Sequence, residues 1–443
     1  MIGTRTRGQR PAAACVAVLA ALAVEARADG LKPGDVLNEK TWEQATGLLP
    51  PEILKHYEKG EYANSIAEWK DGAVRWGAEF AGATEENATR LEASPEGSVV
   101  DKATGERPPF VYGFPFQRIA AADPNAGVKV LWNYYYGYWS NGSRRNVSML
   151  AWLDRSGPSR SAVMDVHFCQ YDGQPADYRP KANPHDLLQQ SLANAMEPAD
   201  LQGTTALTWR YRAPDRRDSS WAYVPALRRV RQVSPSNRSD GFVGSDLSQD
   251  DGPFFDGKPE DFTWKLVGER EELRLADPYS LRGEYTYVPR PEGGWRVPFQ
   301  PVAMAGFQDP AWKGVAWAPV NFVLVRRPVW VVEGVPHDRY YRFGKVELHI
   351  DRENFRGAWT RKFDWQGELI NSYQIGGYLN GTPDGTHYIW GHGLYYQVAE
   401  DHKRGTATFA GVPPTTWKEP ANDFFMPCNP SFYDYQTLVR FGK

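Results

Sequence analysis

Residues 221–256 read WAYVPALRRVRQVSPSNRSDGFVGSDLSQDDGPFFD and carry the clearest structural pattern in the chain. In the first three positions Trp221 and Tyr223 flank a small residue, and Pro225 ends the run two residues later, which is typical of a half-buried β-strand. The run that follows mixes apolar residues with three arginines, Arg228, Arg229 and Arg231. The two runs therefore predict a hairpin in which a basic strand lies beside an aromatic one.

A loop rich in Gly, Ser, Asn and Asp follows the predicted hairpin. Closely spaced acidic residues can bind calcium, but Gly252 comes one residue later than an EF-hand requires, and Gly257 occupies the place of its closing Glu. We therefore predict no metal site. The acidic residues are interpreted as turn formers, at Asp246, Asp250, Asp251 and Asp256.

The string YVPALRRVR at 223–231, followed by GSD at 244–246, resembles a family of uncharacterised periplasmic proteins of Gram-negative bacteria. The resemblance continues through VWVVEGVPHD at 329–338 and through residues 341–369. That family is grouped with the LolA/LolB-like proteins, which sort lipoproteins to the outer membrane.

This resemblance implies a β-dominated α+β fold, with a large curved antiparallel sheet or unclosed half-barrel plugged by helices. It implies a periplasmic carrier or binding protein for a lipid or another hydrophobic molecule, with no catalytic residue and no cofactor. It also implies partners, namely an inner-membrane RND-type transporter and an outer-membrane β-barrel protein. The chain is much longer than the small lipoprotein carriers, which argues against a lipoprotein as the cargo.

Aromatic residues make up 14% of the chain and recur at alternate positions of predicted strands. Such rings either fill a large β core or line a cavity. The resemblance favours a cavity, because a half-barrel too wide for its own side chains must hold something apolar or collapse. We predict that six residues line it: Trp209, Tyr211, Trp221, Tyr223, Phe242 and Trp264. The three arginines are assigned to the outer strand face, with contact to an anionic headgroup or a transporter as the alternative.

The N-terminus has the features of a secretory signal. Three arginines precede an apolar run of about 13 residues at 12–24, and an A-x-A site predicts cleavage after Ala28. Removing residues 1–28 takes four Arg and Glu25 from the 51 basic and 54 acidic residues, which leaves 47 and 53 and a net charge of −6. This acidic balance gives no reason to expect nucleic acid as a partner. We predict a periplasmic location.

The mature chain is predicted to have two parts. Residues 29–125 form an N-terminal helical and irregular segment, and residues 126–443 form the half-barrel. Within the second part, aromatic alternation at 130–138 predicts a strand that an Asn-Gly turn joins to the next one. A helix is predicted at 184–197 and a long covering loop at 289–320. Cys169 and Cys428 either pair in the oxidising periplasm or remain two buried thiols.

Several classes of enzyme lack their signatures in this sequence. No G-x-S-x-G elbow is present, the histidines have no zinc-site spacing, and no Gly-rich loop ends in Lys-Ser/Thr. A glycosidase needs only two carboxylates, and tryptophans can stack on sugars. The alternative function is therefore a periplasmic carbohydrate-binding protein or glycosidase.

Overall fold

The computed structural model describes residues 30–69, 76–233, 238–285, 287–298, 302–381, 388–413 and 421–441; the side chains of 378–381 and 388–394 are not part of this description. The predicted signal sequence at residues 1–28 lies outside these ranges. One sheet of 18 strands dominates the fold, which is α+β as predicted. The helices are α1 (Pro51–Glu58), α2 (Ala78–Arg90), α3 (Ala126–Trp139), α4 (Pro278–Arg282) and α5 (Tyr435–Phe441).

Two antiparallel meanders build the sheet. The first consists of β5 (Arg144–Leu153), β6 (Pro158–Gln170), β7 (Leu187–Glu197), β8 (Thr205–Tyr211), β9 (Ser219–Val224) and β10 (Arg229–Val233). The second consists of β14 (Val323–Pro336), β15 (Lys345–Asp351), β16 (Gly357–Phe363), β17 (Leu369–Gly381), β18 (Tyr388–Asp401) and β19 (Thr406–Gly411). Pairing of β19 with β5 joins the two meanders into one surface.

Shorter strands complete the sheet at its margins. β2 (Asn64–Ala67) lies parallel to β14 and carries β1 (Val36–Leu37), whereas β20 (Ala421–Phe424) pairs with β5 and with β13 (Trp295–Pro298), which carries β12 (Val288–Pro289). β3 (Leu91–Ala93) and β4 (Val99–Asp101) form a separate small sheet. The predicted loop at 289–320 thus contains β13 and a 3-10 turn at Gly306–Gln308.

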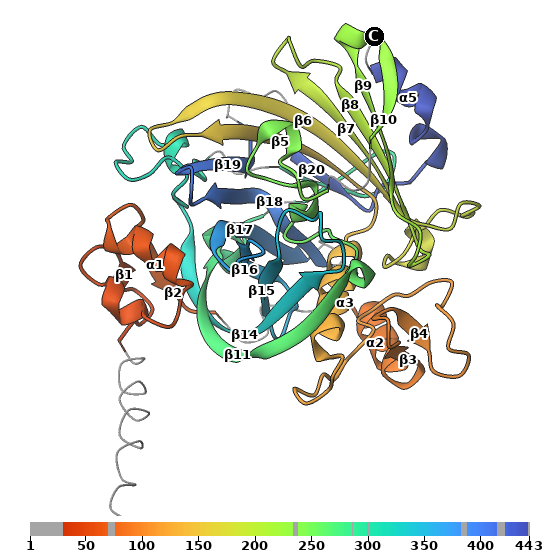
Figure 1. Ribbon diagram of the computed structural model, residues 1–443, viewed down its shortest axis with the longest axis horizontal. Helices are drawn as coiled ribbons and strands as arrows, with labels where there is room; N and C mark the ends of the chain where they lie inside the picture. The colour runs from red at the N-terminus through yellow and green to blue at the C-terminus, as the bar shows by residue number, and fades with distance from the viewer. Residues whose placement is uncertain are drawn as a thin grey trace, which may run out of the picture.

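The sheet is curved and unclosed. The strands at its two ends are β10, which pairs with β9, and the long β11 (Phe262–Ala276), which pairs with β14. Figure 1 shows the sheet bending through a wide arc, with β6–β10 at one end and β11 and β14 at the other. Among the described strands β10 and β11 do not pair with each other. The chain therefore runs from one edge of the sheet to the other between residues 233 and 262.

The hairpin predicted at the start of residues 221–256 is confirmed. β9 and β10 are antiparallel, with Val230 opposite Tyr223 and Gln232 opposite Trp221. A 3-10 turn at Pro225–Leu227 connects them, and Arg228 closes it in the left-handed region at φ 47°. Pro225 fits the first position of this turn because its φ is already fixed near the helical value.

The strand predicted at 130–138 is wrong, because these residues belong to helix α3. Every residue of α3 except Lys129 is buried. A segment that is apolar on all sides has no polar phase from which its period can be read, so the aromatic alternation could not distinguish strand from helix. Gly127 lets α3 approach β11, since a Cβ atom there would lie 2.8 Å from the backbone carbon of Lys265. The Asn-Gly pair at 141–142 accordingly links α3 to β5.

The helix predicted at 184–197 is also wrong, because this segment contains strand β7 between β6 and β8. Its leucines fit a helical stripe, but the strand also buries polar side chains, Gln190 and Asn194. Buried polar residues hide the two-residue period that would have identified a strand. The side chain of Asn183, which precedes the strand, donates to the Leu187 carbonyl and accepts from the Leu187 N–H, each at 2.8 Å.

The N-terminal part follows the prediction only in places. Residues 29–125 contain the helices α1 and α2 and irregular connections as predicted, but they also contain the short strands β1 and β2 and the small β3–β4 sheet. The division of the chain at residue 125 stays a prediction. Within the described ranges, no helix has the length and apolar character needed to cross a bilayer.

Cys169 and Cys428 form a disulfide bond, which is one of the two states predicted for them. Cys169 lies at the end of β6 and Cys428 in the segment before α5, with 5.3 Å between their Cα atoms. This separation is ordinary for a disulfide. The bond fastens the C-terminal segment to the first meander, and Figure 1 shows α5 beside β9 and β10.

Candidate functional site

Helix α5 covers the aromatic face of the hairpin. Tyr211 and Tyr223 are buried in one apolar cluster with Leu438 of α5, and Trp209 and Trp221 border that cluster. The indole N–H of Trp209 donates to the Tyr433 carbonyl at 2.9 Å, and its ring meets that of Trp221 edge-on at 5.5 Å. The structure thus brings together four of the six residues predicted to line a cavity. Their contact with a ligand stays a prediction.

The other two predicted residues lie elsewhere. Trp264 is 7% exposed in the central core, packs against Phe255 and Phe262, and donates its indole N–H to the Pro259 carbonyl at 2.8 Å. Phe242 is half-buried against the same core. Both therefore belong to a different part of the molecule from the hairpin, although a contact with ligand is untested for them as well.

A groove of about 780 Å³ separates the hairpin from α5, and we call it the hairpin groove. Apolar side chains of both elements face it, and two arginines stand beside them. Its lining is formed by Tyr223, Pro225, Arg228, Arg229, Val230, Tyr435 and Val439. Tyr435 is 55% exposed, and the neighbouring Leu227 is 51% exposed. Large apolar side chains are thus presented to solvent next to positive charge.

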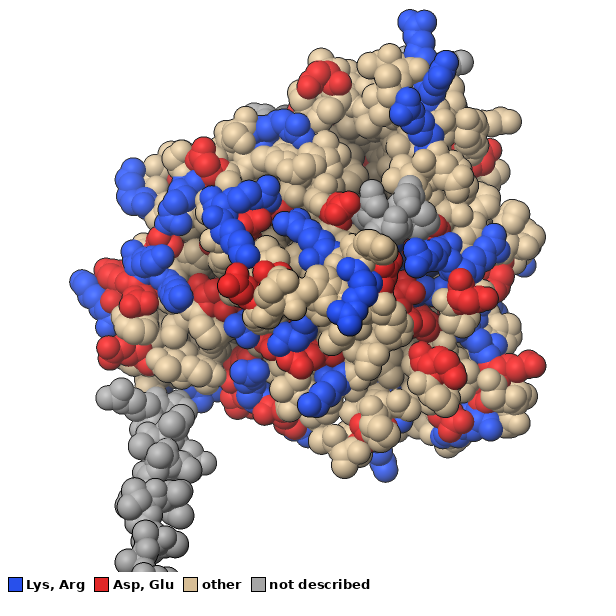
Figure 2. Space-filling view, viewed as in Figure 1, with Lys and Arg blue, Asp and Glu red and all other residues tan. Residues whose placement is uncertain are grey.

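The arginines of β10 occupy its outer face, as predicted. Arg229 and Arg231 are exposed, whereas Val230 between them is half-buried against the aromatic cluster. Within the described part of the chain, neither these two nor Arg228 forms an ion pair. In Figure 2 blue side chains project from the corner where Figure 1 places β9 and β10, while the rest of this face mixes both charges.

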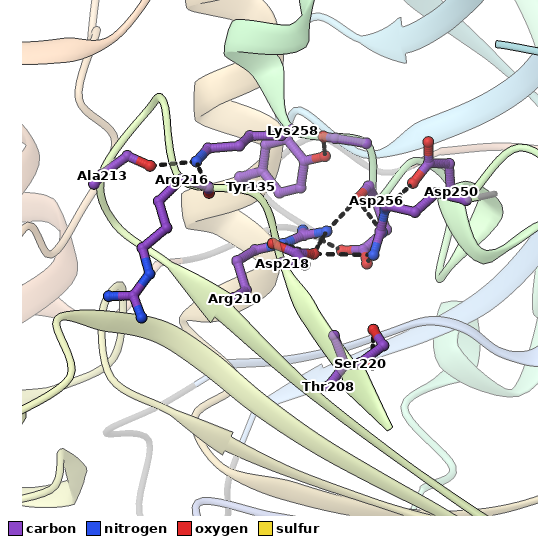
Figure 3. Close-up of polar contacts among 12 residues, drawn as sticks. Tyr135, Thr208, Arg210, Ala213, Arg216, Asp218, Ser220, Asp250, Asp256 and Lys258 are labelled. Carbon is purple, nitrogen blue, oxygen red and sulfur yellow. Dashed lines mark hydrogen bonds and ion pairs between the residues drawn. The ribbon is translucent and has the colours of Figure 1, made fainter. Parts of the chain in front are cut away.

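Inside the curve of the sheet, ion pairs link the loop after β10 to β8. Arg210 of β8 binds Asp218 at 3.0 Å and Asp256 at 2.9 Å. Arg238 binds Asp218 at 2.9 Å, Asp250 at 2.6 Å and Asp256 at 3.2 Å. Figure 3 shows Arg210 and the three carboxylates converging, with Lys258 to one side. The aspartates that were predicted to form turns therefore also neutralise buried arginines.

The charges of this network are held in place by their neighbours. Burial alone would raise the pKa of Asp218, but Arg210 and Arg238 outweigh burial and hold that pKa below its usual value. Asp251 of the same loop pairs with Lys362 of β16, and the Tyr341 hydroxyl donates to Asp250 at 2.8 Å. The loop thus ties the first meander to the second across the interior of the sheet.

Helix α3 and the loop pack on the concave side of the sheet, and the predicted apolar cavity stays a prediction. A cavity of about 200 Å³ with a mixed lining lies beside them, and we call it the concave cavity. Its lining is formed by Tyr138, Arg144, Asn146, Ser148, Val166, Phe168, Gln189, Gly252, Pro253, Asp256 and Gln397. Sequence reasoning missed this lining because the polar residues of β5 gave no motif.

The chain belongs to the family described as protein of unknown function DUF1329, whose family model matches residues 37–404. This confirms the resemblance to an uncharacterised family. None of the curated proteins compared with the chain matches it.

Solved structures resemble the chain at low identity. A domain from Vibrio parahaemolyticus, provisionally assigned to outer membrane lipoprotein sorting, is 15% identical, covers 72% of this chain and 100% of its own, and has a TM-score of 0.47. A DUF1329 family protein from Desulfovibrio piger has the same identity and coverage and a TM-score of 0.45. A LolA superfamily protein from Nitrosomonas europaea is 11% identical, covers 69% and 96%, and has a TM-score of 0.39. We draw no functional conclusion from likenesses at this level.

Proposed function

We propose that the protein binds a lipid or another molecule with an apolar chain and carries it through the periplasm. The apolar chain of this ligand would lie in the hairpin groove. The observation that carries this proposal is the groove itself, in which apolar side chains of two elements face each other beside two arginines. Its volume of about 780 Å³ falls in the range of small-molecule sites, roughly 300–1,000 Å³. The resemblance to periplasmic carriers supports the same function.

Hydrophobic burial is strong enough to hold such a ligand. Each buried methylene contributes about 0.8 kcal/mol, so ten of them contribute about 8 kcal/mol. That free energy corresponds to a dissociation constant of about 1 μM before the cost of immobilising the ligand. Arg228 and Arg229 can add attraction for an anionic headgroup at the side of the groove. No catalytic group is required.

The ligand can enter and leave the hairpin groove past the short helix α5. α5 spans 7 residues and begins at the exposed Tyr435. The apolar chain of a ligand can therefore enter the hairpin groove from solvent without opening the sheet. Release into a membrane would require α5 to move or a partner to bind the groove more tightly than the ligand does. We propose that such partners are an inner-membrane RND-type transporter and an outer-membrane β-barrel protein.

Binding of a fluorescent fatty acid tests the hairpin groove directly. We expect the protein to bind cis-parinaric acid, and Val230→Asp or Val439→Asp to weaken binding at least tenfold, because each places a charge against the apolar chain. Val267→Asp is the matched control, since Val267 is 49% exposed on β11 and distant in the sheet. No binding by the wild type, or equal binding by all variants, would contradict the proposal.

The carbohydrate alternative requires open aromatic platforms. Trp209 and Trp221 are half-buried and packed against each other, so their faces are not free in the way that sugar stacking needs. Binding or cleavage of an oligosaccharide by a protein that binds no fatty acid would favour that alternative.

A further inference from the structure

Arg144 places a positive charge inside the molecule. It is the first residue of β5 and is 1% exposed. Its guanidinium lies 4.3 Å from the ring centre of Tyr138 on α3 and 4.1 Å from that of Phe168, its partner across the β5–β6 pair. The aromatic rings thus fix the plane of the guanidinium and leave its edge to make polar contacts.

Arg144 has no carboxylate partner in the described part of the chain. Within the described ranges it forms no ion pair, its Nε atom has no hydrogen-bond partner, and its Nη1 donates to the Gly142 carbonyl at a long 3.4 Å. Its further polar contact is with the hydroxyl of Tyr138. An arginine with only uncharged partners in the interior is costly, because the charge has lost its hydration.

The nearby ion network does not supply the missing charge. Its three carboxylates, Asp218, Asp250 and Asp256, are bound by two arginines, Arg210 and Arg238. Lys258 lies beside them and donates to the backbone carbonyls of Ala213 and Arg216. Asp256 also lines the concave cavity, but one of its oxygens binds Arg210 and the other binds Arg238. Within the described part of the chain, these carboxylates pair with Arg210 and Arg238 and not with Arg144.

The concave cavity beside Arg144 is rich in hydrogen-bond donors. Asn146 and Ser148 follow Arg144 at two-residue steps on β5, so all three side chains face the cavity. The Oδ1 atom of Asn146 has no partner, and a flip of the amide would direct its N–H₂ group to that position. Gln189 of β7 and Gln397 of β18 line the other walls. The half-buried Ser148 and Gln189 leave the cavity open to solvent.

We propose that the concave cavity binds an oxyanion, a carboxylate or phosphate group, with Arg144 as its counter-charge and Asn146 as a hydrogen-bond donor. The cavity volume of about 200 Å³ admits such a group with a few carbon atoms attached. The oxyanion is either a free small anion or the head of an amphipathic molecule. This site is separate from the hairpin groove, and it stands whether or not the groove binds an apolar chain.

Thermal unfolding with chosen anions tests the site. Sodium phosphate and sodium hexanoate are compared with sodium chloride at equal ionic strength, and hexanol is the uncharged control. We expect at least one of the two oxyanions to raise the Tm of the wild type above its value in chloride, and hexanol to leave it unchanged. A response to phosphate identifies a free anion as the ligand, and a response to hexanoate alone identifies a headgroup.

Three variants separate binding from structure. In chloride, Arg144→Met is expected to unfold at a higher temperature than the wild type, because an uncompensated charge is removed, and to lose at least nine-tenths of the oxyanion response. Asn146→Asp places a carboxylate beside Arg144. It is also expected to unfold at a higher temperature and to lose at least nine-tenths of the oxyanion response, so it replaces Arg144→Met if that variant does not fold. Arg229→Met, an exposed arginine of the hairpin groove, is expected to keep the response. The proposal is overturned if the wild type responds to neither oxyanion, or if the response survives both changes in the cavity.

Discussion

His56 is held between two carboxylates. Its Nδ1 atom lies 2.7 Å from Glu61, its Nε2 atom lies 2.8 Å from Glu400 of β18, and the residue is 5% exposed. Burial would lower the pKa of His56, but the two glutamates outweigh burial and raise it to about 9. Both ring nitrogens then donate a hydrogen bond, and the imidazolium ties the segment after α1 to the second meander.

The raised pKa of His56 predicts a pH-dependent stability. The stabilisation is complete below pH 6.5, the value of an unperturbed histidine, and is lost as the pH rises through about 9. A shift of this size corresponds to about 3 kcal/mol. Urea unfolding at pH 6, 7.5 and 9 measures it, and His56→Gln should flatten the decline. Part of the decline in the free energy of unfolding should remain in His56→Gln because of His349. Burial would lower the pKa of His349, but the nearby Glu272 and Glu347 raise it.

The exposed His337 provides the control for this experiment. His337→Gln should retain the full decline in the free energy of unfolding between pH 6 and 9. An identical decline in His56→Gln and in the wild type would show that the imidazolium of His56 does not stabilise the fold.

Single residues show where sequence reasoning ended. Alternation placed Trp221 and Tyr223 on one strand face correctly, because a strand's period is a local property. The partners of Asp250 and Asp256 come from β8 and from the loop, so their role as counter-ions depends on long-range packing that no local pattern encodes. In the sequence a role in turns was enough to account for these aspartates, so their pairing with buried arginines was not predicted.

The disulfide between β6 and the C-terminal segment should stabilise the aromatic cluster under α5. Removing a native disulfide typically costs about 2–5 kcal/mol, and the loop closed here is long, with a sequence separation of 259 residues. Cys428→Ser is expected to lose free energy of unfolding in that range and to bind the dye ANS, because Tyr211 and Tyr223 become accessible.

The double variant Cys169→Ser/Cys428→Ser is the control, and it should lose no more stability than Cys428→Ser alone. Equal unfolding free energies for the wild type and Cys428→Ser would show that α5 stays in place without its covalent attachment.

The pair Lys362–Asp251 fastens the interior loop to β16. Lys362 is 3% exposed and Asp251 is 1% exposed, so Lys362→Met leaves a buried carboxylate without its cation. We expect a loss of about 3–5 kcal/mol in the free energy of unfolding. Asp251→Asn in the same chain should restore part of this loss, which a double-mutant cycle in urea would measure. Additive effects of the two substitutions would contradict a direct ion pair.

The elements that the sequence predicted correctly share one property. The two strands of the hairpin, β9 and β10, have enough polar or turn-forming residues around them for their period and ends to be visible. α3 and β7 were assigned to the wrong class, because the first is apolar on all sides and the second buries glutamine and asparagine. Burial on every side removes the contrast on which a sequence pattern depends.

The molecule as a whole is an unclosed sheet whose interior is filled by α3 and by the loop from β10 to β11. The resemblance implied the open sheet and helices that plug it, but not the charged loop, which depends on the network around Arg210. The larger space lies at the free end of the first meander, in the hairpin groove. This arrangement places the proposed binding site for the ligand's apolar chain at the margin of the sheet, away from α3 and the interior loop.

The central claim is that the protein carries a molecule with an apolar chain in the hairpin groove. The most direct test is organic extraction of the natively purified protein, followed by mass spectrometry with quantification per mole of protein. We predict close to one acyl-chain compound per wild-type molecule and at least tenfold less in Val439→Asp. A wild-type protein free of any such compound, or equal amounts in both proteins, would contradict the account.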